Sequence, residues 1–461
     1  MLAGAKRQGL IVLGACGFCY GAPVRLGIAL CLLAIYAPAR ADGLGADDLK
    51  NKKEDGYFTG LPLANYTTDT GFGYGGRLYY YFDGDRDDPR FAHTPYLFRV
   101  FLQGFWSTRG LQFHWLDFDA PKVFDSPYRL RSQLIYERNI NQNYFGVGDR
   151  SLAPLSFPGA PGATYGSFAT YTNDLAKIDS NGQTWSHYNE LDLIRPLFLG
   201  SVERLFFHDR VRVLGGVGLS YADINDYTGK LVDAGIGTAP EGPTRLHTEC
   251  QQGLVVGCSG GRDDFLRLGI SYDTRDFEPD PKAGVFLDAA LDAGTIALGS
   301  QYDYARTMFA ARGYWSPDPD DVHLVLAGRA VFEDQTSGTP FFSMDTFPFT
   351  EDPRTGLGGQ RTMRGYRQDR FVGPVYTLVN GEARYSTGHI HFWGQTFGLI
   401  LVPFVDFGRT YDSLSDLSVH DWKLSYGGAV RISWNLATII TVDYGRSSED
   451  TGLYVNFNHM F

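Results

Sequence analysis

The chain has 461 residues, of which 15% are aromatic and 20% charged, and its formal net charge is −11. This acidic balance excludes nucleic acid as a partner, because binding to phosphates relies on basic side chains. After residue 41 no apolar run is long enough for a transmembrane helix, which excludes a helical membrane protein.

The first 41 residues have the organisation of a secretory signal peptide. Lys6 and Arg7 supply positive charge, residues 26–37 form a short apolar core, and Ala39-Arg40-Ala41 fits an A-x-A cleavage site. We therefore expect the mature chain to begin at Asp42. Removing four of the 41 basic residues and none of the 52 acidic residues leaves 37 against 52, a net charge of −15.

From residue 71 onward, apolar and polar side chains alternate with the period of two that is typical of β-strands. In residues 265–273, Leu266, Leu268 and Ile270 fall on one face, and Arg267 and Ser271 on the other. Tyrosine and tryptophan cluster at the ends of such segments, as aromatic girdles do at the two bilayer interfaces. The pattern predicts an all-β fold, a transmembrane β-barrel, with a soluble β-sandwich as the competing class.

We expect residues 42–70 to form a short periplasmic segment and residues 71–461 to form a 16-stranded antiparallel barrel. The even number of strands suits closure with both termini on one side of the membrane. The predicted strands are 71–83, 95–106, 110–119, 128–138, 143–149, 184–195, 205–222, 262–273, 284–294, 302–315, 322–332, 371–386, 394–407, 423–434, 437–446 and 453–461. Short connections alternate with long ones, which indicates a bacterial outer-membrane barrel with periplasmic termini and long extracellular loops.

Two of the five cysteines, Cys250 and Cys258, lie outside the signal peptide. An even pair in an exported chain favours a disulfide, and two buried free thiols are the alternative. Zinc would need more ligands than this stretch offers. We expect no metal and no cofactor.

Residues 358–371, in the sixth predicted outer loop, contain four arginines together with Met363, Tyr366 and Phe371. Long loops without regular structure are usually functional or disordered, and these three residues are of types that pack. The composition therefore favours a loop folded into the lumen over a solvated surface loop.

The stretch from Gly359 to Tyr366 resembles the VRGF/Y loop of the BamA/TamA-type outer-membrane protein superfamily, also called the bacterial surface antigen family. Met363 stands where the family usually has valine. Residues 404–408 resemble the F-x-D-x-G strand of the family, and residues 380–384 resemble the strand that follows its loop. The resemblance covers about residues 260–461 by motif and residues 60–260 only by pattern.

Alternation turns the side chains of Glu382 and Asp406 toward the lumen. A lumenal arginine is costly unless its charge is matched, and a guanidinium suits bidentate carboxylate partners. We therefore expect Arg364 to contact Asp406, Glu382 or both, with Gly365 allowing a tight turn beside the wall. The alternative is that both carboxylates only hydrate the lumen.

The last predicted strand ends in Leu453, Val455, Phe457 and Phe461, which would share the lipid-facing side. The first predicted strand is crowded with glycine, at Gly71, Gly73, Gly75 and Gly76, and glycine weakens strands. We expect a weak seam between these strands, which the resemblance implies could open laterally and pair with strands of other proteins. Glycine needed for clearance beneath a plugged lumen is the alternative.

The resemblance implies a barrel that assists the insertion or export of other proteins. Residues 42–70 are too few for the periplasmic POTRA domains of the family's assembly factors, which implies a barrel-only member, and a separate periplasmic partner is expected beside outer-membrane lipid. A structural or pore-forming surface antigen is the alternative. We expect no enzymatic activity, because G-x-S-x-G is absent and His187, His208, His389 and His391 are scattered.

Overall fold

The computed structural model describes residues 52–461 except 89–90, 92–93, 208, 236, 279, 319–321, 352–353, 393–394 and 435–437. The expected signal peptide, residues 1–41, lies outside these residues. Within the described ranges, no helix is long and apolar enough to cross a membrane.

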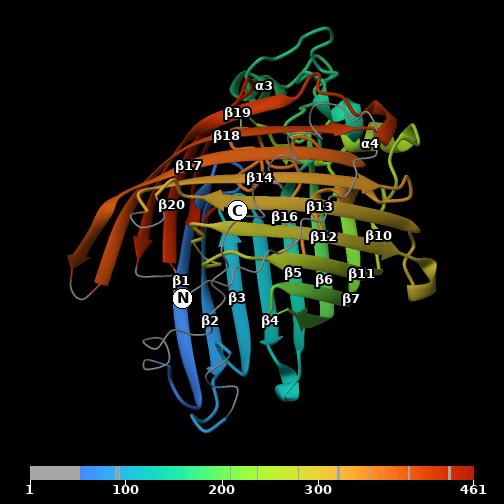
Figure 1. Ribbon diagram of the computed structural model, residues 1–461. Coiled ribbons are helices and arrows are strands. Elements are labelled where there is room, and N and C mark those ends of the chain that lie inside the picture. The colour runs from blue at the N-terminus through green and yellow to red at the C-terminus, as the bar shows by residue number, and fades with distance from the viewer. Residues whose placement is uncertain are drawn as a thin grey trace, which may run out of the picture. The chain divides into compact units, whose positions relative to one another are not determined.

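Sixteen antiparallel strands form a closed barrel, as the sequence predicts. Strands that follow one another along the chain lie side by side, and the pairing of β1 with β21 closes the ring (Figure 1). The short β10 and β11 both pair with β7, so these two segments occupy one position in the wall. The wall strands are β1 (Gly56–Thr67), β2 (Gly71–Phe82), β3 (Phe98–Ser107), β4 (Leu111–Ala120), β5 (Tyr128–Asn143), β6 (Glu190–Phe206), β7 (Val211–Asp226), β10 (Gly261–Arg262), β11 (Phe265–Asp273), β12 (Gly284–Gly294), β13 (Tyr304–Trp315), β14 (Leu324–Gln335), β17 (Val375–Phe392), β18 (Gln395–Tyr411), β19 (Lys423–Trp434), β20 (Thr438–Arg446) and β21 (Thr451–Phe457).

The remaining elements lie in the connections. They are the helices α3 (Phe168–Leu175), α4 (Arg245–Gln251) and α5 (Phe341–Met344), the 3₁₀ turns η2 (Val123–Asp125), η3 (Gly148–Leu152), η4 (Ile296–Leu298) and η5 (Leu414–Asp416), and the short strands β8 (Leu231–Asp233), β9 (Thr238–Pro240), β15 (Thr346–Phe347) and β16 (Arg354–Thr355).

The two faces of the wall follow the alternation of the sequence. In β11, Leu266, Leu268 and Ile270 are each about half exposed on the outside, whereas Arg267 and Ser271 are buried on the inside. An apolar outer face and a polar inner face are what a barrel in a lipid bilayer requires. A soluble β-sandwich is therefore excluded.

The barrel begins at Gly56, inside the segment that we expected to precede it. The sequence of β1, GYFTGLPLANYT, contains Gly60 and Pro62, which made it resemble a loop. Proline cannot donate a hydrogen bond to a sheet ladder and is therefore confined largely to edge strands. β1 tolerates Pro62 because it is the strand with the least pairing on one side.

The predicted fifth strand, residues 143–149, is wrong. β5 runs on to Asn143, and the chain then turns through Gly146 and Gly148, both with positive φ, into η3. The total of sixteen is nevertheless correct, because this extra strand offsets the missed β1.

The three longest connections lie at one end of the barrel and carry the three helices of the described residues. They comprise residues 144–189, 227–260 and 336–374, and they overlap the long connections predicted from the sequence. In the second connection, Cys250 at the end of α4 is bonded to Cys258, with Cα atoms 5.9 Å apart. The predicted disulfide is present, and the alternative of two free thiols is excluded.

The last four residues leave the wall. β21 ends at Phe457, and Asn458, with a φ of +69°, turns the chain inward. Phe461 is buried against Tyr314 and Val325, and its main-chain oxygen accepts a hydrogen bond from Arg384 Nη2 at 2.9 Å. The expectation that Phe461 faces lipid as part of the last strand is therefore wrong.

Candidate functional site in the barrel lumen

The connection from β14 to β17, residues 336–374, folds against the inner wall. Met363, Tyr366 and Phe371 are fully or almost fully buried in a cluster with inward-facing residues of the wall, such as Met308 and Leu378. Burying several large apolar side chains stabilises this placement, each by roughly 1.5–3 kcal/mol. The loop is thus a packed part of the barrel interior, as its composition indicates.

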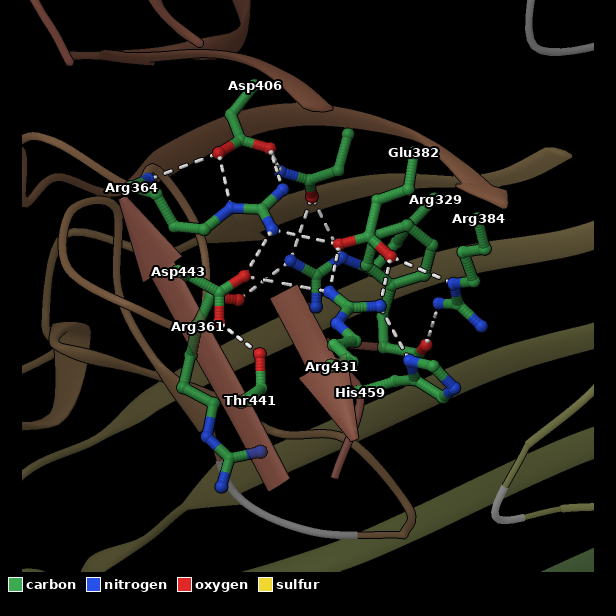
Figure 2. Close-up of polar contacts among 12 residues, drawn as sticks. Arg329, Arg361, Arg364, Glu382, Arg384, Asp406, Arg431, Thr441, Asp443 and His459 are labelled. Carbon is green, nitrogen blue, oxygen red and sulfur yellow. Dashed lines mark hydrogen bonds and ion pairs between the residues drawn. The ribbon is translucent and has the colours of Figure 1, made fainter. Parts of the chain in front are cut away.

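Arg364 lies at the centre of a buried ion cluster (Figure 2). Its guanidinium binds Asp406 in a bidentate arrangement, with Nε to Oδ2 at 3.0 Å and Nη2 to Oδ1 at 2.9 Å. Nη1 lies 2.8 Å from Glu382 Oε1, and the guanidinium stacks 3.3 Å from the centre of the Phe404 ring. The structure therefore brings Arg364 together with both carboxylates named from the sequence.

The cluster also contains charges that the sequence did not suggest as partners. Glu382 receives hydrogen bonds from Arg431 at 2.7 and 2.9 Å and from Arg384 at 2.9 Å. Asp443 Oδ1 lies 3.3 Å from Arg364 Nη1 and 3.7 Å from Arg431 Nη2. Three arginines thus face three carboxylates, which is the balance that buried charges need. The period-two pattern of β19 could have indicated Arg431, which faces inward beside apolar outward neighbours.

The inward-turned C-terminus reaches the same cluster. His459 Nδ1 lies 2.6 Å from Arg431 Nη1, and His459 Nε2 lies 2.8 Å from Asp280 Oδ1. Burial, reinforced by the positive charges of Arg384 and Arg431, lowers the pKa of His459 to about 3. The imidazole is therefore neutral at physiological pH, accepts a hydrogen bond from Arg431 and donates one to Asp280.

The residues after Arg364 connect the loop to the turns beside the seam. Gly365 N donates to the Tyr454 hydroxyl at 3.1 Å, and Tyr366 packs edge-on against Phe371 with ring centres 5.0 Å apart. Arg367 then bridges two turns, with Nη1 to Thr68 O at 2.8 Å and Nε to Asp450 Oδ2 at 2.8 Å. The loop holds the β1–β2 turn and the β20–β21 turn at the same point.

The seam itself lies between β1 and β21, and it is short. Only Tyr66 and Thr67 of β1 pair with β21, opposite Val455 and Tyr454, whereas β1 pairs with β2 over all twelve of its residues. An antiparallel pair of two residues supplies few ladder hydrogen bonds. The barrel is therefore closed by a weak contact.

The predicted seam glycines are not at the seam. Gly71, Gly73, Gly75 and Gly76 belong to β2, which pairs fully with β1 and along most of its length with β3. A Cβ atom at Gly73 would lie 2.2 Å from the Phe105 ring, and one at Gly75 would lie 2.1 Å from the Gly104 carbonyl oxygen. These two glycines provide clearance for the neighbouring strands, whereas the alternative stated from the sequence was clearance beneath a plugged lumen.

Two carboxylates of the β14–β17 loop share one amide group, that of Gln142 in β5. Gln142 Nε2 lies 2.9 Å from Asp369 Oδ2 and 3.3 Å from Asp345 Oδ2. Burial and the neighbouring Asp345 carboxylate raise the pKa of Asp369 well above its usual range. Burial also raises the pKa of Asp345, although Arg195 lies 2.7 Å away.

We expect Asp369→Asn to raise the free energy of unfolding at neutral pH by about 1–3 kcal/mol. Since the pKa of Asp369 is raised in the folded state, folding takes up a proton, so the natural barrel loses stability as pH rises through that pKa. Asparagine carries no charge and tolerates the φ of +53° found here. Urea unfolding at several pH values measures the effect: the free energy of unfolding of Asp369→Asn should depend less on pH than that of the natural protein. The exposed Asp87→Asn is the control. An unchanged profile for Asp369→Asn would contradict this account.

Comparisons with known proteins agree with the geometry. A family model described as Omp85 superfamily domain matches residues 116–458, and a model described as Domain of unknown function (DUF5982) matches residues 40–97. The outer membrane protein assembly factor BamA of Nitratidesulfovibrio vulgaris is 25% identical over 177 residues, covering 36% of this chain and 20% of that protein. The chain thus spans about one fifth of the length of this curated relative.

Two solved structures share the fold. BamA from Haemophilus ducreyi lacking POTRA domains 1–3 has a TM-score of 0.51 at 11% identity, covering 95% of this chain and 78% of that one. CdiB from Escherichia coli has a TM-score of 0.50 at 10% identity, covering 93% of this chain and 73% of that one. The family match extends the resemblance from residues 260–461 into the half of the chain where only the strand pattern was recognisable.

Proposed function

Because the chain belongs to the Omp85 superfamily, we propose that it assists the insertion of other β-barrel proteins into the outer membrane. The observation that carries the proposal is the two-residue seam between β1 and β21. The similarity to a BamA assembly factor supports the same role. We place the termini in the periplasm, because the long connections lie at the opposite end of the barrel.

The seam offers a template for an incoming strand. Among the described residues, Gly56–Asn65 of β1 have no partner in β21, so their backbone groups on that side form a strand edge. Such an edge pairs readily with an added strand through main-chain hydrogen bonds. Opening the seam requires the loss of only two residue pairs in the ladder, while β1 stays attached to β2. Client proteins and a separate periplasmic partner would meet the barrel at this edge.

A disulfide across the seam tests the proposal. Tyr66 and Val455 are directly opposite each other, and opposed residues in antiparallel strands are about 4.5–5.5 Å apart at Cα, within the range of a disulfide. In cells that depend on this protein, oxidised Tyr66→Cys/Val455→Cys should lower the levels of other outer-membrane proteins, and a reductant should restore them. The matched control is Tyr74→Cys/Trp106→Cys, which joins opposed residues of β2 and β3.

The control pair should leave those levels unchanged, because the β2–β3 pairing does not need to open. If the locked seam also left them unchanged, insertion through the seam would be excluded. Altered uptake of small solutes as the sole consequence of depletion would instead support the alternative, a structural or pore-forming barrel.

A further inference from the structure

A cavity of about 380 Å³ lies in the lumen, separate from the Arg364 cluster. It is bounded by inward-facing residues of β1 to β7 and of β11 to β13, and by the β14–β17 loop through residues such as Asp345, Phe347 and Arg361. Sites for small molecules typically measure about 300–1,000 Å³. The volume is therefore at the lower end of what a small ligand occupies.

One wall of this cavity is unusually apolar for a barrel interior. Inward-facing positions of outer-membrane barrels are normally polar, because the lumen contains water. Here β3, β4, β5 and β6 instead present a continuous apolar surface, formed by Phe105, Leu111, Phe113, Trp115, Ile135 and Leu197. Leaving such a surface against water costs roughly 25 cal/mol per Å² of apolar area. The wall suits the hydrocarbon part of a ligand.

The polar side of the cavity carries charges of both signs, with five arginines (Arg77, Arg195, Arg267, Arg306 and Arg361) and four carboxylates (Glu137, Asp263, Asp292 and Asp345). Arg77 donates to Gln103 Oε1 at 2.8 Å, and no carboxylate among the described residues lies within ion-pair distance of it. Figure 2 shows Arg361 pointing away from the ion cluster, and its side chain lines the cavity. By contrast, the lining residue Arg267 is matched by Asp292, at 2.6 Å. An anionic group is therefore the ligand part that Arg77 lacks.

Two further buried polar atoms beside the cavity have no hydrogen-bond partner. They are Trp115 Nε1, a donor, and Asn65 Oδ1, an acceptor. Buried polar atoms without a partner are uncommon and call for an explanation such as a bound molecule. Trp115 belongs to β4 and Asn65 to β1, so the two unpartnered atoms lie on different strands that line the cavity.

The cavity reaches the seam. Asn65 of β1 and Asn456 and Phe457 of β21 all belong to its lining. β1 and β21 pair only at Tyr66–Thr67 and Tyr454–Val455. A molecule with a hydrocarbon chain could therefore enter from the bilayer between the two strands without crossing the polar ends of the barrel.

We infer that this cavity binds a single-chain anionic amphiphile, a long-chain fatty acid. The carboxylate lies at Arg77, and the hydrocarbon chain lies along the wall that contains Phe113 and Trp115. A charge-assisted hydrogen bond to the arginine orients the molecule. The volume accommodates one chain, which excludes a two-chain phospholipid. The cavity shares Asn65 with the edge proposed for client strands, but the inference concerns binding inside the lumen and does not rest on the insertion role.

Photolabelling of the full-length protein in nanodiscs of zwitterionic lipid tests the inference. The probe is palmitic acid with a diazirine at the end of the chain, and labelled residues are located by peptide mass spectrometry. Two neighbouring residues of β4 distinguish probe in the cavity from probe in the surrounding lipid, because Trp115 lines the cavity whereas Leu116 is exposed on the outer face. Labelling of Phe113 and Trp115 should saturate and be displaced by unlabelled palmitic acid, while labelling of Leu116 should rise linearly.

A second experiment compares probes that differ in the charge of the head group. A probe of equal chain length with an amine head should label Leu116 equally and the cavity about tenfold less, the ratio expected from losing one charge-assisted hydrogen bond. Arg77→Gln should reduce cavity labelling by the fatty-acid probe by a similar factor. Arg131→Gln, an inward arginine outside the cavity lining, should not.

Labelling confined to the outer face, cavity labelling that does not saturate, or equal cavity labelling by the two probes would overturn the inference. The comparison of the two head groups uses the natural protein, so it decides the question even if Arg77→Gln fails to assemble.

Discussion

Replacing Arg364 with alanine is expected to lower the barrel's free energy of unfolding by about 3–5 kcal/mol. The substitution leaves Asp406 without its bidentate partner and deprives Glu382 of one of its three arginines. Both carboxylates are buried, so water cannot replace the lost guanidinium. The loop should detach from the wall, because Arg364 is its principal polar contact with β17 and β18.

The temperature at which the folded barrel loses its faster mobility on gels measures the loss of stability. Protease cleavage within residues 336–374 measures the release of the loop from the wall. Arg361→Ala is the control, since this arginine lies in the same loop but points away from the cluster (Figure 2). Arg364→Lys should fall between the two, because an ammonium group keeps the charge but cannot form the bidentate pair. If Arg364→Ala unfolds at the same temperature as Arg361→Ala, the cluster does not brace the barrel.

The central part of this site follows from the sequence. The loop motif singles out Arg364, and strict alternation in two later strands turns Glu382 and Asp406 inward. Asp443 was not assigned in the same way, although β20 pairs with β19 in the same part of the wall. Its contact with Arg364 depends on where the loop places the guanidinium, and that position leaves no local pattern in the sequence of β20.

The seam shows a different limit of sequence reasoning. β1 contains Gly60 and Pro62, which weaken the signals of a strand, and these residues are tolerated because the strand has a partner along its full length on only one side. The one-sided pairing of β1 therefore explains both why its sequence lacks a clear strand pattern and why the barrel is closed at this strand. Phe461 misleads for a related reason, because the turn at Asn458 removes the last residues from the alternation.

Gly365 connects the ion cluster to the seam, and its replacement should have the second large effect. Its φ is +98°, a conformation that other residues adopt only with strain. A Cβ atom would also lie 2.7 Å from the backbone nitrogen of Arg446, in β20. Backbone cannot move aside as a flexible side chain can, so Gly365→Ala must displace either the loop or the end of β20. We expect a loss of about 2–5 kcal/mol from backbone strain and overpacking together.

The displacement should be felt at the seam as well as in the loop. Gly365 N donates to the hydroxyl of Tyr454, the residue that pairs with Thr67 across the seam. Gly428→Ala is the matched control, because a Cβ atom there meets open space. Crosslinking between Tyr66→Cys and Val455→Cys should slow markedly in the Gly365→Ala background and keep its rate in the Gly428→Ala background. Equal rates in the two backgrounds would mean that the loop does not hold the seam, and that the cluster serves only the stability of the wall.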